Sequence, residues 1–232
     1  MRFGNGKGKQ VASIPGVLLA AGGSERFGSE KLLTRLSSGE RLLERALKVH
    51  LLSSISPLIL VASPSLGSVI GKGAVFSTSK LSIVKRLNGW YSFSSRWGRG
   101  RLVVNEDFQN GMSSSIHKGL SCLRDEEQAN GVLISLSDLP LLTTETIDLF
   151  VEKFFEEKIG ILVPVFNDIT GHPVIFDMAL FKKDIAGIEG DAGLRGLIRN
   201  YPERVTKLPW HDNSVTWDVD TPLDLERLAT LA

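Results

Sequence analysis

The sequence predicts one α/β domain of three layers, in which helices pack on both faces of a mostly parallel central sheet. Short continuous apolar runs at residues 16–21, 57–62 and 131–136 are typical of strands that are buried on both faces. Segments with helical periodicity separate these runs, and strands that alternate with helices favour a parallel sheet. A hydrophobic fraction of 42% and a charged fraction of 23% are ordinary for a chain with a proper core.

The first half of the chain alternates as such a sheet requires. The run at 16–21 enters a glycine-rich turn, and residues 42–52 follow with apolar side chains at helical spacing. After the second run, the apolar residues 101–104 predict a third strand. A helix over residues 111–123 comes next, with its serines as plausible N-caps.

The second half continues the pattern. The run at 131–136 predicts a fourth strand, and Thr143 or Thr144 caps a helix that reaches about residue 158. The remaining expected elements are strands at 161–165 and 173–176 around a turn at 168–172, and helices at 193–200 and 222–231.

No internal repeat or linker stands out, so we predict a single domain over residues 14–232 after a Gly- and Lys-rich tail at 1–13. Within the domain, residues 67–101 are expected to form an irregular excursion, with a hairpin around Asn88-Gly89. The excursion has no acidic residue and seven basic ones, which are Lys72, Lys80, Lys85, Arg86, Arg96, Arg99 and Arg101. Such a segment is either a surface for anionic ligands or a solvated basic loop.

Several classes of protein are excluded by simple features of the chain. The longest apolar runs are far too short to cross a bilayer, and no secretory signal is visible, so we expect a cytoplasmic protein. The single cysteine, Cys122, excludes an internal disulfide and a cysteine-rich metal site. We expect Cys122 to be a small buried hydrophobe rather than a nucleophile.

The strongest chemical signal is the glycine-rich loop that follows the first predicted strand. It reads LAAGGSERFGSEK from Leu19 to Lys31. Glycines allow backbone N–H groups to approach phosphate oxygens, while Arg26 and Lys31 supply positive charge. The loop is not a P-loop, because no Gly-Lys-Ser/Thr follows the four-residue gap after Gly23, and it lacks the dinucleotide fingerprint G-x-G-x-x-G. A plain strand-to-loop connection is the alternative.

An aspartate follows the fourth predicted strand, in the segment Ser137-Asp138-Leu139-Pro140. The carboxyl end of a central strand is where open α/β sheets bind ligands. Mg²⁺ prefers one or two carboxylates together with phosphate oxygens, so Asp138 is the expected first protein ligand of a magnesium ion. Asp before Pro is also a frequent turn former, which is the structural alternative.

The glycine-rich loop matches the pattern L-x-A-G-x-S-x-R-x-G-x-x-K at Leu19, Ala21, Gly22, Ser24, Arg26, Gly28 and Lys31. This pattern resembles the signature loop of the MobA-like NTP-transferases, and more narrowly that of their molybdenum cofactor cytidylyltransferase branch. Further segments are similar to family motifs and occur in the family's order. They are N-x5-G-M-x2-S from Asn105, S-D-L-P from Ser137, G-H-P from Gly171, G-D-x-G-x-R from Gly190 and D-V-D-T-P from Asp218.

The resemblance implies a Rossmann-like domain of the nucleotide-diphospho-sugar transferase type, which joins an NMP to a phosphorylated acceptor and releases pyrophosphate. The residues that it places on the nucleotide are Leu19, Ala20, Ala21, Gly22, Gly23, Ser24, Arg26, Lys31, Gly111 and Ser115. The implied catalytic residues are Arg26, Lys31 and Asp138, and Asp220 is the implied second carboxylate on the metal. His172, Asp191 and Arg195 are associated with the acceptor.

Structural alternatives apply to several of these residues. The serines after Gly111 cap a helix whether or not they bind a base. His172 is equally explained as a satisfied structural histidine beside a proline, and Asp191 with Arg195 as a local ion pair. Asp224 is expected to serve the first turn of the last helix. In S-D-L-P, Ser and Leu replace the family's Gly and Gln, so any polar contact made by that Gln is lost.

The Ala-Ala-Gly at residues 20–22, where guanylyl-transferring relatives tend to have Ala-Gly-Gly, favours CTP over GTP. The implied reaction is the Mg²⁺-dependent transfer of CMP from CTP to a molybdopterin-type molybdenum cofactor. The alternatives are a guanylyl- or other nucleotidyltransferase acting on a deazaflavin precursor or sugar phosphate, and a non-catalytic carrier or assembly factor on the same fold. A molybdoenzyme or chaperone is a further candidate partner, nucleic acid and membrane are not expected, and the oligomeric state stays open.

Overall fold

The computed structural model describes residues 13–22, 27, 30–72, 81–87, 89–128, 130–157, 160–191 and 193–231. These residues form one ten-stranded sheet with the order β10-β7-β9-β6-β1-β2-β5-β4-β3, and β8 pairs with β7. The strands are β1 Gly16–Ala20, β2 Leu58–Ala62, β3 Ser82–Leu87, β4 Trp90–Ser95, β5 Gly98–Val104, β6 Val132–Leu136, β7 Ile161–Phe166, β8 Ile169–Thr170, β9 Val174–Phe176 and β10 Val205–Pro209.

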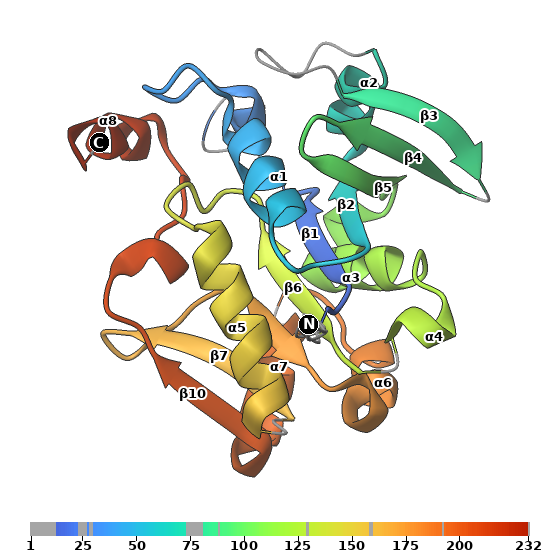
Figure 1. The fold of residues 1–232 in the computed structure, drawn as a ribbon, viewed down its shortest axis with the longest axis vertical. Coiled ribbons are helices and arrows are strands. Elements are labelled where there is room, and N and C mark those ends of the chain that lie inside the picture. Colours follow the sequence, from blue (N-terminus) through green and yellow to red (C-terminus); the bar gives the residue numbers. More distant parts are fainter. Residues whose placement is uncertain are drawn as a thin grey trace, which may run out of the picture.

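Helices lie on both faces of this sheet, as Figure 1 shows, with α1 and α5 in front of it and α3 and α7 behind. The α-helices are α1 Leu42–Leu52, α2 Pro64–Gly71, α3 Met112–Leu120, α4 Asp125–Gln128, α5 Thr144–Glu157, α6 Met178–Ala186, α7 Gly193–Asn200 and α8 Pro222–Leu231. Short 3₁₀ helices are η2 Lys31–Leu33, η3 Phe108–Asn110, η4 Pro202–Arg204 and η5 Asn213–Val215. The predicted three-layer α/β fold is confirmed.

The central strands are buried on both faces because their side chains pack into two separate hydrophobic cores, one on each face of the sheet. Along β1, Leu18 belongs to the core beneath α1 and α5, while Val17 and Leu19 belong to the core beneath α3, α6 and α7. Successive side chains of a strand point to opposite faces, so a strand covered on both sides needs a continuous apolar run. All five residues of β1 and of β2 are accordingly buried.

The sheet is mixed rather than wholly parallel. Strand β1 pairs parallel with β2 and β6, β2 with β5, and β7 with β10. Strand β9 runs antiparallel between β6 and β7, and β3, β4 and β5 form an antiparallel extension. The parallel strands β1, β2, β5 and β6 therefore end at one edge of the sheet, and β6 and β2 flank β1 on opposite sides. A strand order that reverses in this way marks the crevice in which open α/β sheets bind ligands.

The prediction of an irregular excursion over residues 67–101 is wrong. Helix α2 extends into this segment, and β3, β4 and the start of β5 form antiparallel pairs, with one register shift in β3 between Ile83 and Lys85. The expected hairpin is present, because β3 and β4 pair around residues 88–89. Only Phe93 of β4 is buried, and its ring lies so close to Gly100 that a Cβ there would approach it to 2.5 Å. With one buried side chain, β4 lacks the alternation of apolar and polar residues by which a strand is predicted from sequence.

The structure also contains elements that the sequence did not predict, namely α2, α4, α6, β8 and β10. In the described part of the chain, no helix is long and apolar enough to span a membrane.

Candidate active site

Two hydrogen bonds fix the end of β6 beside the end of β1. The backbone N–H of Ser137 and its hydroxyl both donate to the carbonyl oxygen of Leu19, at 3.1 and 2.8 Å. Asp138 follows immediately, with 19% of its side chain exposed. The Ser137 hydroxyl thus helps to lock the turn that presents Asp138 at the ends of the strands.

A second aspartate segment lies beside this turn. The backbone N–H of Val219 donates to the carbonyl oxygen of Asp138 at 3.0 Å. On either side of Val219, Asp218 and Asp220 each bring a carboxylate oxygen to Asp138, so that the three oxygens lie within 4.8 Å of one another. Residues two apart in an extended segment point to the same side, which explains how both aspartates of D-V-D reach the cluster.

The last helix holds Asp220 in place through Asp224. One carboxylate oxygen of Asp224 accepts the backbone N–H groups of Asp220 and Thr221, at 3.1 and 2.8 Å, and the Thr221 hydroxyl at 2.8 Å. These are the N–H groups that precede and open α8, so Asp224 caps the first turn in the way that the sequence predicts.

The ammonium group of Lys31 lies between two of the three aspartates. Its Nζ is 2.8 Å from Asp138 Oδ2 and 3.0 Å from Asp220 Oδ1, although Lys31 precedes them by 107 and 189 residues. Burial alone would lower the pKa of Lys31, but the charges and hydrogen bonds of the two carboxylates raise it above the ordinary 10.5. Lys31 is therefore positively charged at pH 7.

The carboxylate cluster has the chemistry of a divalent metal site. Its donors are all carboxylate oxygens, which Mg²⁺ and Mn²⁺ prefer. The buried Oδ1 of Asp138 accepts no hydrogen bond from the described residues, which suits an atom that binds a metal ion. Burial and the neighbouring charges of Asp138 and Asp220 raise the pKa of Asp218. Crowded carboxylates of this kind are stabilised by a bound cation.

Asp218 is a site residue that the sequence reasoning missed. The alternation D-V-D carried the signal, since an extended segment with aspartates at i and i+2 presents both on one side. Asp138 and Asp220, which the sequence predicted as metal ligands, lie together in the structure.

The start of α3 forms a second wall near the strand ends. Asn105, which follows β5, is buried and donates from Nδ2 to the hydroxyls of Ser114 and Ser115, at 2.9 and 3.0 Å. The N-cap residue Gly111 has a φ of 91°, which favours glycine. Ser115, the other nucleotide-binding residue predicted in this turn, is buried. Its hydroxyl supports the turn by accepting the hydrogen bond from Asn105.

The predicted acceptor residues lie in two segments, with Asp191 just before α7, Arg195 within α7 and His172 just before β9. The Asp191 carboxylate accepts the backbone N–H of Met112 at 3.1 Å, and it forms no ion pair with Arg195 in the described part of the chain. His172 is buried enough to lower the pKa of its imidazole, which the Ile134 carbonyl and Asp138 oppose and Arg195 reinforces. The ring Nδ1 of His172 is buried without a hydrogen-bond partner among the described residues.

The structure describes only some residues of the glycine-rich loop. Leu19, Ala20 and Ala21 are buried, whereas Gly22 is exposed. A Cβ at Gly22 would meet no atom within 4 Å. The predicted nucleotide-binding residues Gly23, Ser24 and Arg26 lie outside the described residues.

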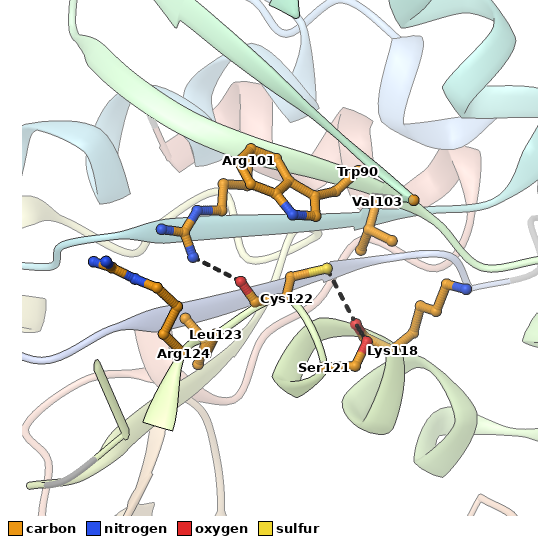
Figure 2. Close-up of a pocket in the computed structure, with 9 residues that line it drawn as sticks. Trp90, Arg101, Val103, Lys118, Ser121, Cys122, Leu123 and Arg124 are labelled. Atoms are coloured by element: carbon orange, nitrogen blue, oxygen red, sulfur yellow. Dashed lines mark hydrogen bonds between the residues drawn. The ribbon is translucent and has the colours of Figure 1, made fainter. Parts of the chain in front are cut away.

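A cavity of about 300 Å³ lies elsewhere, between the β4–β5 hairpin and the end of α3 (Figure 2). Its lining residues are Gly89, Trp90, Arg101, Val103, Lys118, Ser121, Cys122, Leu123 and Arg124, none of which was predicted as a site residue. Cys122 is buried there, as predicted, and burial raises the pKa of its thiol. This thiol is therefore protonated at neutral pH, which agrees with a structural role.

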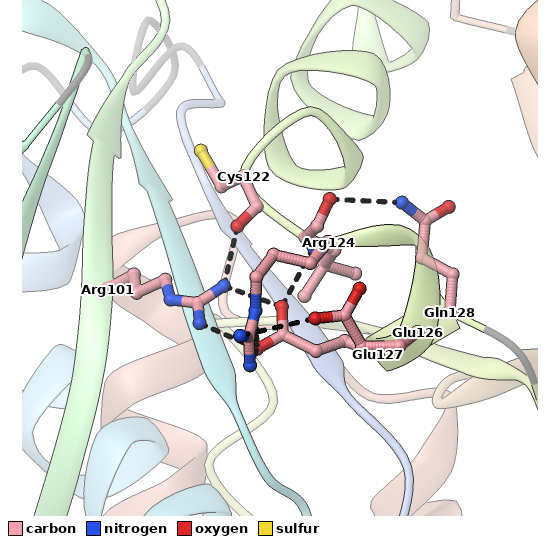
Figure 3. Close-up of polar contacts among 7 residues, drawn as sticks. Arg101, Cys122, Arg124, Glu126, Glu127 and Gln128 are labelled. Atoms are coloured by element: carbon pink, nitrogen blue, oxygen red, sulfur yellow. Dashed lines mark hydrogen bonds and ion pairs between the residues drawn. The ribbon is translucent and has the colours of Figure 1, made fainter.

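Two of the basic side chains beside this cavity, Arg101 and Arg124, connect parts of the protein to one another. Figure 3 shows the Arg101 guanidinium between the Glu127 carboxylate and the Cys122 carbonyl. The Arg101 guanidinium also stacks over the Trp90 ring, with its Cζ 5.0 Å from the ring centroid. Arg124 binds the same Glu127 carboxylate. The cavity therefore lies where these contacts connect the hairpin to α4. The candidate active site is the carboxylate cluster instead.

With this geometry established, the family follows from sequence comparison. The family model of the MobA-like NTP transferase domain matches residues 16–205. The chain belongs to this family. The matched segment spans β1 to the start of β10 and therefore includes Lys31 and Asp138.

Three relatives are similar over much of the chain. Nicotine blue oxidoreductase of Paenarthrobacter nicotinovorans is 26% identical over 93% of this chain and 96% of its own length. Purine catabolism protein PucB of Bacillus subtilis is 27% identical over 89% and 91%. A probable molybdenum cofactor guanylyltransferase of Thermococcus sibiricus is 27% identical over 64% and 60%.

Solved structures share the fold. Rv0371c of Mycobacterium tuberculosis H37Rv is 26% identical with a TM-score of 0.72, covering 94% of this chain and 99% of that one. The manganese complex of Rv0371c is 25% identical with a TM-score of 0.69 and the same coverage. A relative of this fold therefore binds a divalent cation, the type of ion for which the carboxylate cluster is suited.

Proposed function

We propose that this protein is a Mg²⁺-dependent cytidylyltransferase, which transfers CMP from CTP to a molybdopterin-type molybdenum cofactor. The observation that carries the proposal is the meeting of Lys31 with Asp138, Asp218 and Asp220 at the carboxyl edge of the sheet, beside the glycine-rich loop. This set of charges suits a metal-bound triphosphate, and the chain belongs to a family of NTP transferases.

Asp138, Asp218 and Asp220 are the residues that would hold the metal ion. When bound, the ion supplies positive charge that neutralises phosphate oxygens and favours departure of pyrophosphate. Asp224 assists by fixing the backbone at Asp220, and Ser137 assists by fixing the turn before Asp138. These two supports keep Asp138 and Asp220 convergent, so the backbone that carries them needs little rearrangement when the metal binds.

The protein groups position the reactants for an in-line substitution. An oxygen of the acceptor phosphate forms a bond to the α-phosphorus of CTP, and the bond from that phosphorus to the pyrophosphate oxygen breaks. Arg26, Lys31 and the loop amides bind the β- and γ-phosphates, where they neutralise the charge of the leaving group. No nucleophilic side chain is required, because the acceptor brings its own nucleophile.

The base is assigned to the wall formed by Gly111 and Ser115, and the choice of cytosine rests on the family pattern. Ala20-Ala21-Gly22 stands where guanylyl-transferring relatives tend to have Ala-Gly-Gly. This difference in the family pattern supports CTP over GTP.

The acceptor is assigned to the side of the crevice with His172, Asp191 and Arg195. The neutral imidazole of His172 has a buried ring nitrogen with no hydrogen-bond partner among the described residues, and it would bond to a polar group of the acceptor heterocycle once the acceptor is bound. Arg195 is exposed and suits the acceptor phosphate. The molybdenum cofactor as acceptor is supported by the similarity to a probable molybdenum cofactor guanylyltransferase.

A nucleotide screen tests the proposal. Purified protein is incubated with Mg²⁺, molybdenum cofactor and one of CTP, GTP, ATP or UTP, and released pyrophosphate is measured. We expect pyrophosphate with CTP, together with a cytosine dinucleotide product identified by mass spectrometry. Omission of the acceptor should abolish both signals, which separates transfer from simple hydrolysis.

The same screen distinguishes the alternatives. Pyrophosphate with GTP alone would identify a guanylyltransferase, and release with sugar phosphates or a deazaflavin precursor would change the acceptor. An absence of pyrophosphate with all four nucleotides would favour a cofactor carrier. Because one relative is named an oxidoreductase, the reactions are also monitored for oxidation of NADH and NADPH. Nicotinamide oxidation without pyrophosphate release would contradict the proposed transfer.

A further inference from the structure

The position of Lys31 creates a competition within the carboxylate cluster. Its ammonium lies 2.8 Å from Asp138 and 3.0 Å from Asp220, and only 11% of its side chain is exposed. These two carboxylates are also the ones that the sequence predicts as metal ligands. The protein without ligands thus already has a cation, its own, at the oxygens that a metal ion would use.

Free metal ions therefore meet an electrostatic barrier at this site. A divalent ion bound to Asp138 and Asp220 would lie a few ångströms from the Lys31 ammonium, where like charges repel strongly in a partly buried setting. The unpartnered Oδ1 of Asp138 does not avoid this repulsion, since it belongs to the carboxylate whose Oδ2 Lys31 holds. Binding of the ion alone would require Lys31 to leave both ion pairs.

A metal–triphosphate complex removes this barrier because it provides a new partner for the carboxylates and another for the Lys31 ammonium. The metal ion neutralises the carboxylates, and the phosphate oxygens accept the ammonium that has left them. The four-carbon stem of lysine allows such a move by side-chain rotation. Lys31 begins the short helix η2, whose backbone is held by the bond from the Thr34 N–H to the Lys31 carbonyl at 3.1 Å. The side chain is then able to move while the backbone stays fixed.

We propose that Lys31 is the resident counter-cation of the metal site, and that it excludes free divalent ions until a nucleoside triphosphate arrives to accept its ammonium. This inference rests on the proposed function, since it takes Asp138 and Asp220 as metal ligands. Its consequence is a thermodynamic coupling in which nucleotide increases metal affinity and metal increases nucleotide affinity by the same factor. The metal then enters the site as its complex with the triphosphate.

Titration of Mn²⁺ in the absence of nucleotide, followed by electron paramagnetic resonance, tests the proposal. Lys31→Met should bind free Mn²⁺ about tenfold or more tightly than the wild type, because the competing charge is gone. Lys31→Arg keeps a cation and should stay within about threefold of the wild type. Lys182→Met is the matched control, since it removes a lysine that pairs with Asp125 at the surface, and its Mn²⁺ affinity should not change.

Two results would overturn the proposal. One is Lys31→Met binding free Mn²⁺ no more tightly than the wild type, and the other is Lys31→Arg binding it as tightly as Lys31→Met. Should the Met variant fail to fold, the wild type still decides the question. Its Mn²⁺ affinity should rise about tenfold or more when CTP or GTP is added. An equal affinity with and without nucleotide would contradict the mechanism.

The outcome is separable from that of the proposed function. The variant titrations contain neither nucleotide nor acceptor, so they report on the counter-cation alone. Failure of nucleotidyl transfer would appear as missing pyrophosphate in the nucleotide screen, whatever the Mn²⁺ titrations give.

Discussion

Arg101 of β5 holds Glu127 of α4 through two parallel hydrogen bonds, with Nη1 2.8 Å from Oε2 and Nη2 2.7 Å from Oε1. Both side chains are largely buried, with 17% and 11% exposed. A bidentate arginine–carboxylate pair of this geometry is among the stronger polar contacts in proteins. It joins the antiparallel extension of the sheet to the segment after α3, and so connects the hairpin to the helix that starts at the candidate base site.

This pair makes a prediction about stability in acid. Hydrogen bonds from Arg101 lower the pKa of Glu127 from 4.5 to about 2. A carboxyl group whose pKa is lower in the folded protein stabilises the fold above its unfolded pKa, and this contribution is lost as the pH falls from about 4.5 to about 2. The full contribution is on the order of 3 kcal/mol. Glu127→Gln should therefore lower the free energy of unfolding at pH 6 and flatten its decline below pH 4.5, as measured by urea unfolding.

Exposed Glu126 is the control for this experiment, because its side chain is 68% exposed. Glu126→Gln should keep the pH dependence of the wild type. A wild-type pH profile in Glu127→Gln would show that the buried pair does not contribute to acid sensitivity.

His50 makes a second prediction, in a higher pH window. Its imidazole is fully buried in α1, where Nδ1 bonds to the Ala46 carbonyl and Nε2 has no partner among the described residues. Burial lowers the pKa of His50 from 6.5 to about 4. Between these values the unfolded chain binds the extra proton, so the fold loses stability as the pH falls, by about 2 kcal/mol at pH 5.

His50→Leu removes the titrating group and keeps an apolar side chain of similar size. The variant should lose less stability than the wild type between pH 7 and pH 5, by the same approximate amount. His211, whose side chain is 79% exposed, provides the control variant His211→Leu. Equal pH dependence of wild type and His50→Leu would contradict the assignment.

Gly111 makes a third prediction, about the turn before α3. Its φ of 91° disfavours any residue with a Cβ, and a Cβ there would lie 2.6 Å from the carbonyl carbon of Gly190. Gly111→Ala should destabilise the protein by about 2 kcal/mol or more and weaken nucleotide binding, since the turn and the Gly190 segment must separate. Urea unfolding and nucleotide titration measure the two effects.

Gly196 is the matched control within α7, where a Cβ would meet nothing within 4 Å. Gly196→Ala should stabilise the protein by about 0.5 to 1 kcal/mol, because alanine is the better helix former. Nucleotide binding should not change in this variant. If Gly111→Ala behaved like Gly196→Ala, the turn would not have the constraint that its geometry indicates.

The sequence was sufficient to predict the parts of the fold that are buried on both faces. Strands β1, β2 and β6 were predicted because two cores demand apolar side chains at every position. Strand β10 was missed because it lies at the edge of the sheet, where Lys207 and Pro209 are exposed. Helix α6 had a readable signal that was overlooked, since Asp177 caps it through bonds to the N–H groups of Ala179 and Leu180.

The candidate site also has features that could be predicted from the sequence and features that could not. Asp138 was predictable because it follows a central strand, and the family motif added Asp220. The contact of Lys31 with these two residues was not predictable, since it depends on how η2, the end of β6 and the segment before α8 meet in three dimensions. The sequence suggested that Lys31 binds phosphate, whereas the structure places its ammonium on the carboxylates.

Calorimetric titration of CTP in the presence of Mg²⁺ tests the central claim most directly, namely that Asp138 belongs to a metal-bound nucleotide site. The wild type should bind CTP with Mg²⁺ more tightly than with EDTA, and Asp138→Asn should lose about tenfold or more of this affinity. Asp168→Asn is the control with the same change of charge, at an exposed turn residue with a φ of 64° that asparagine tolerates. This control should bind as the wild type does. If Asp138→Asn bound Mg²⁺ and CTP as tightly as Asp168→Asn, the carboxylate cluster would not be the nucleotide–metal site.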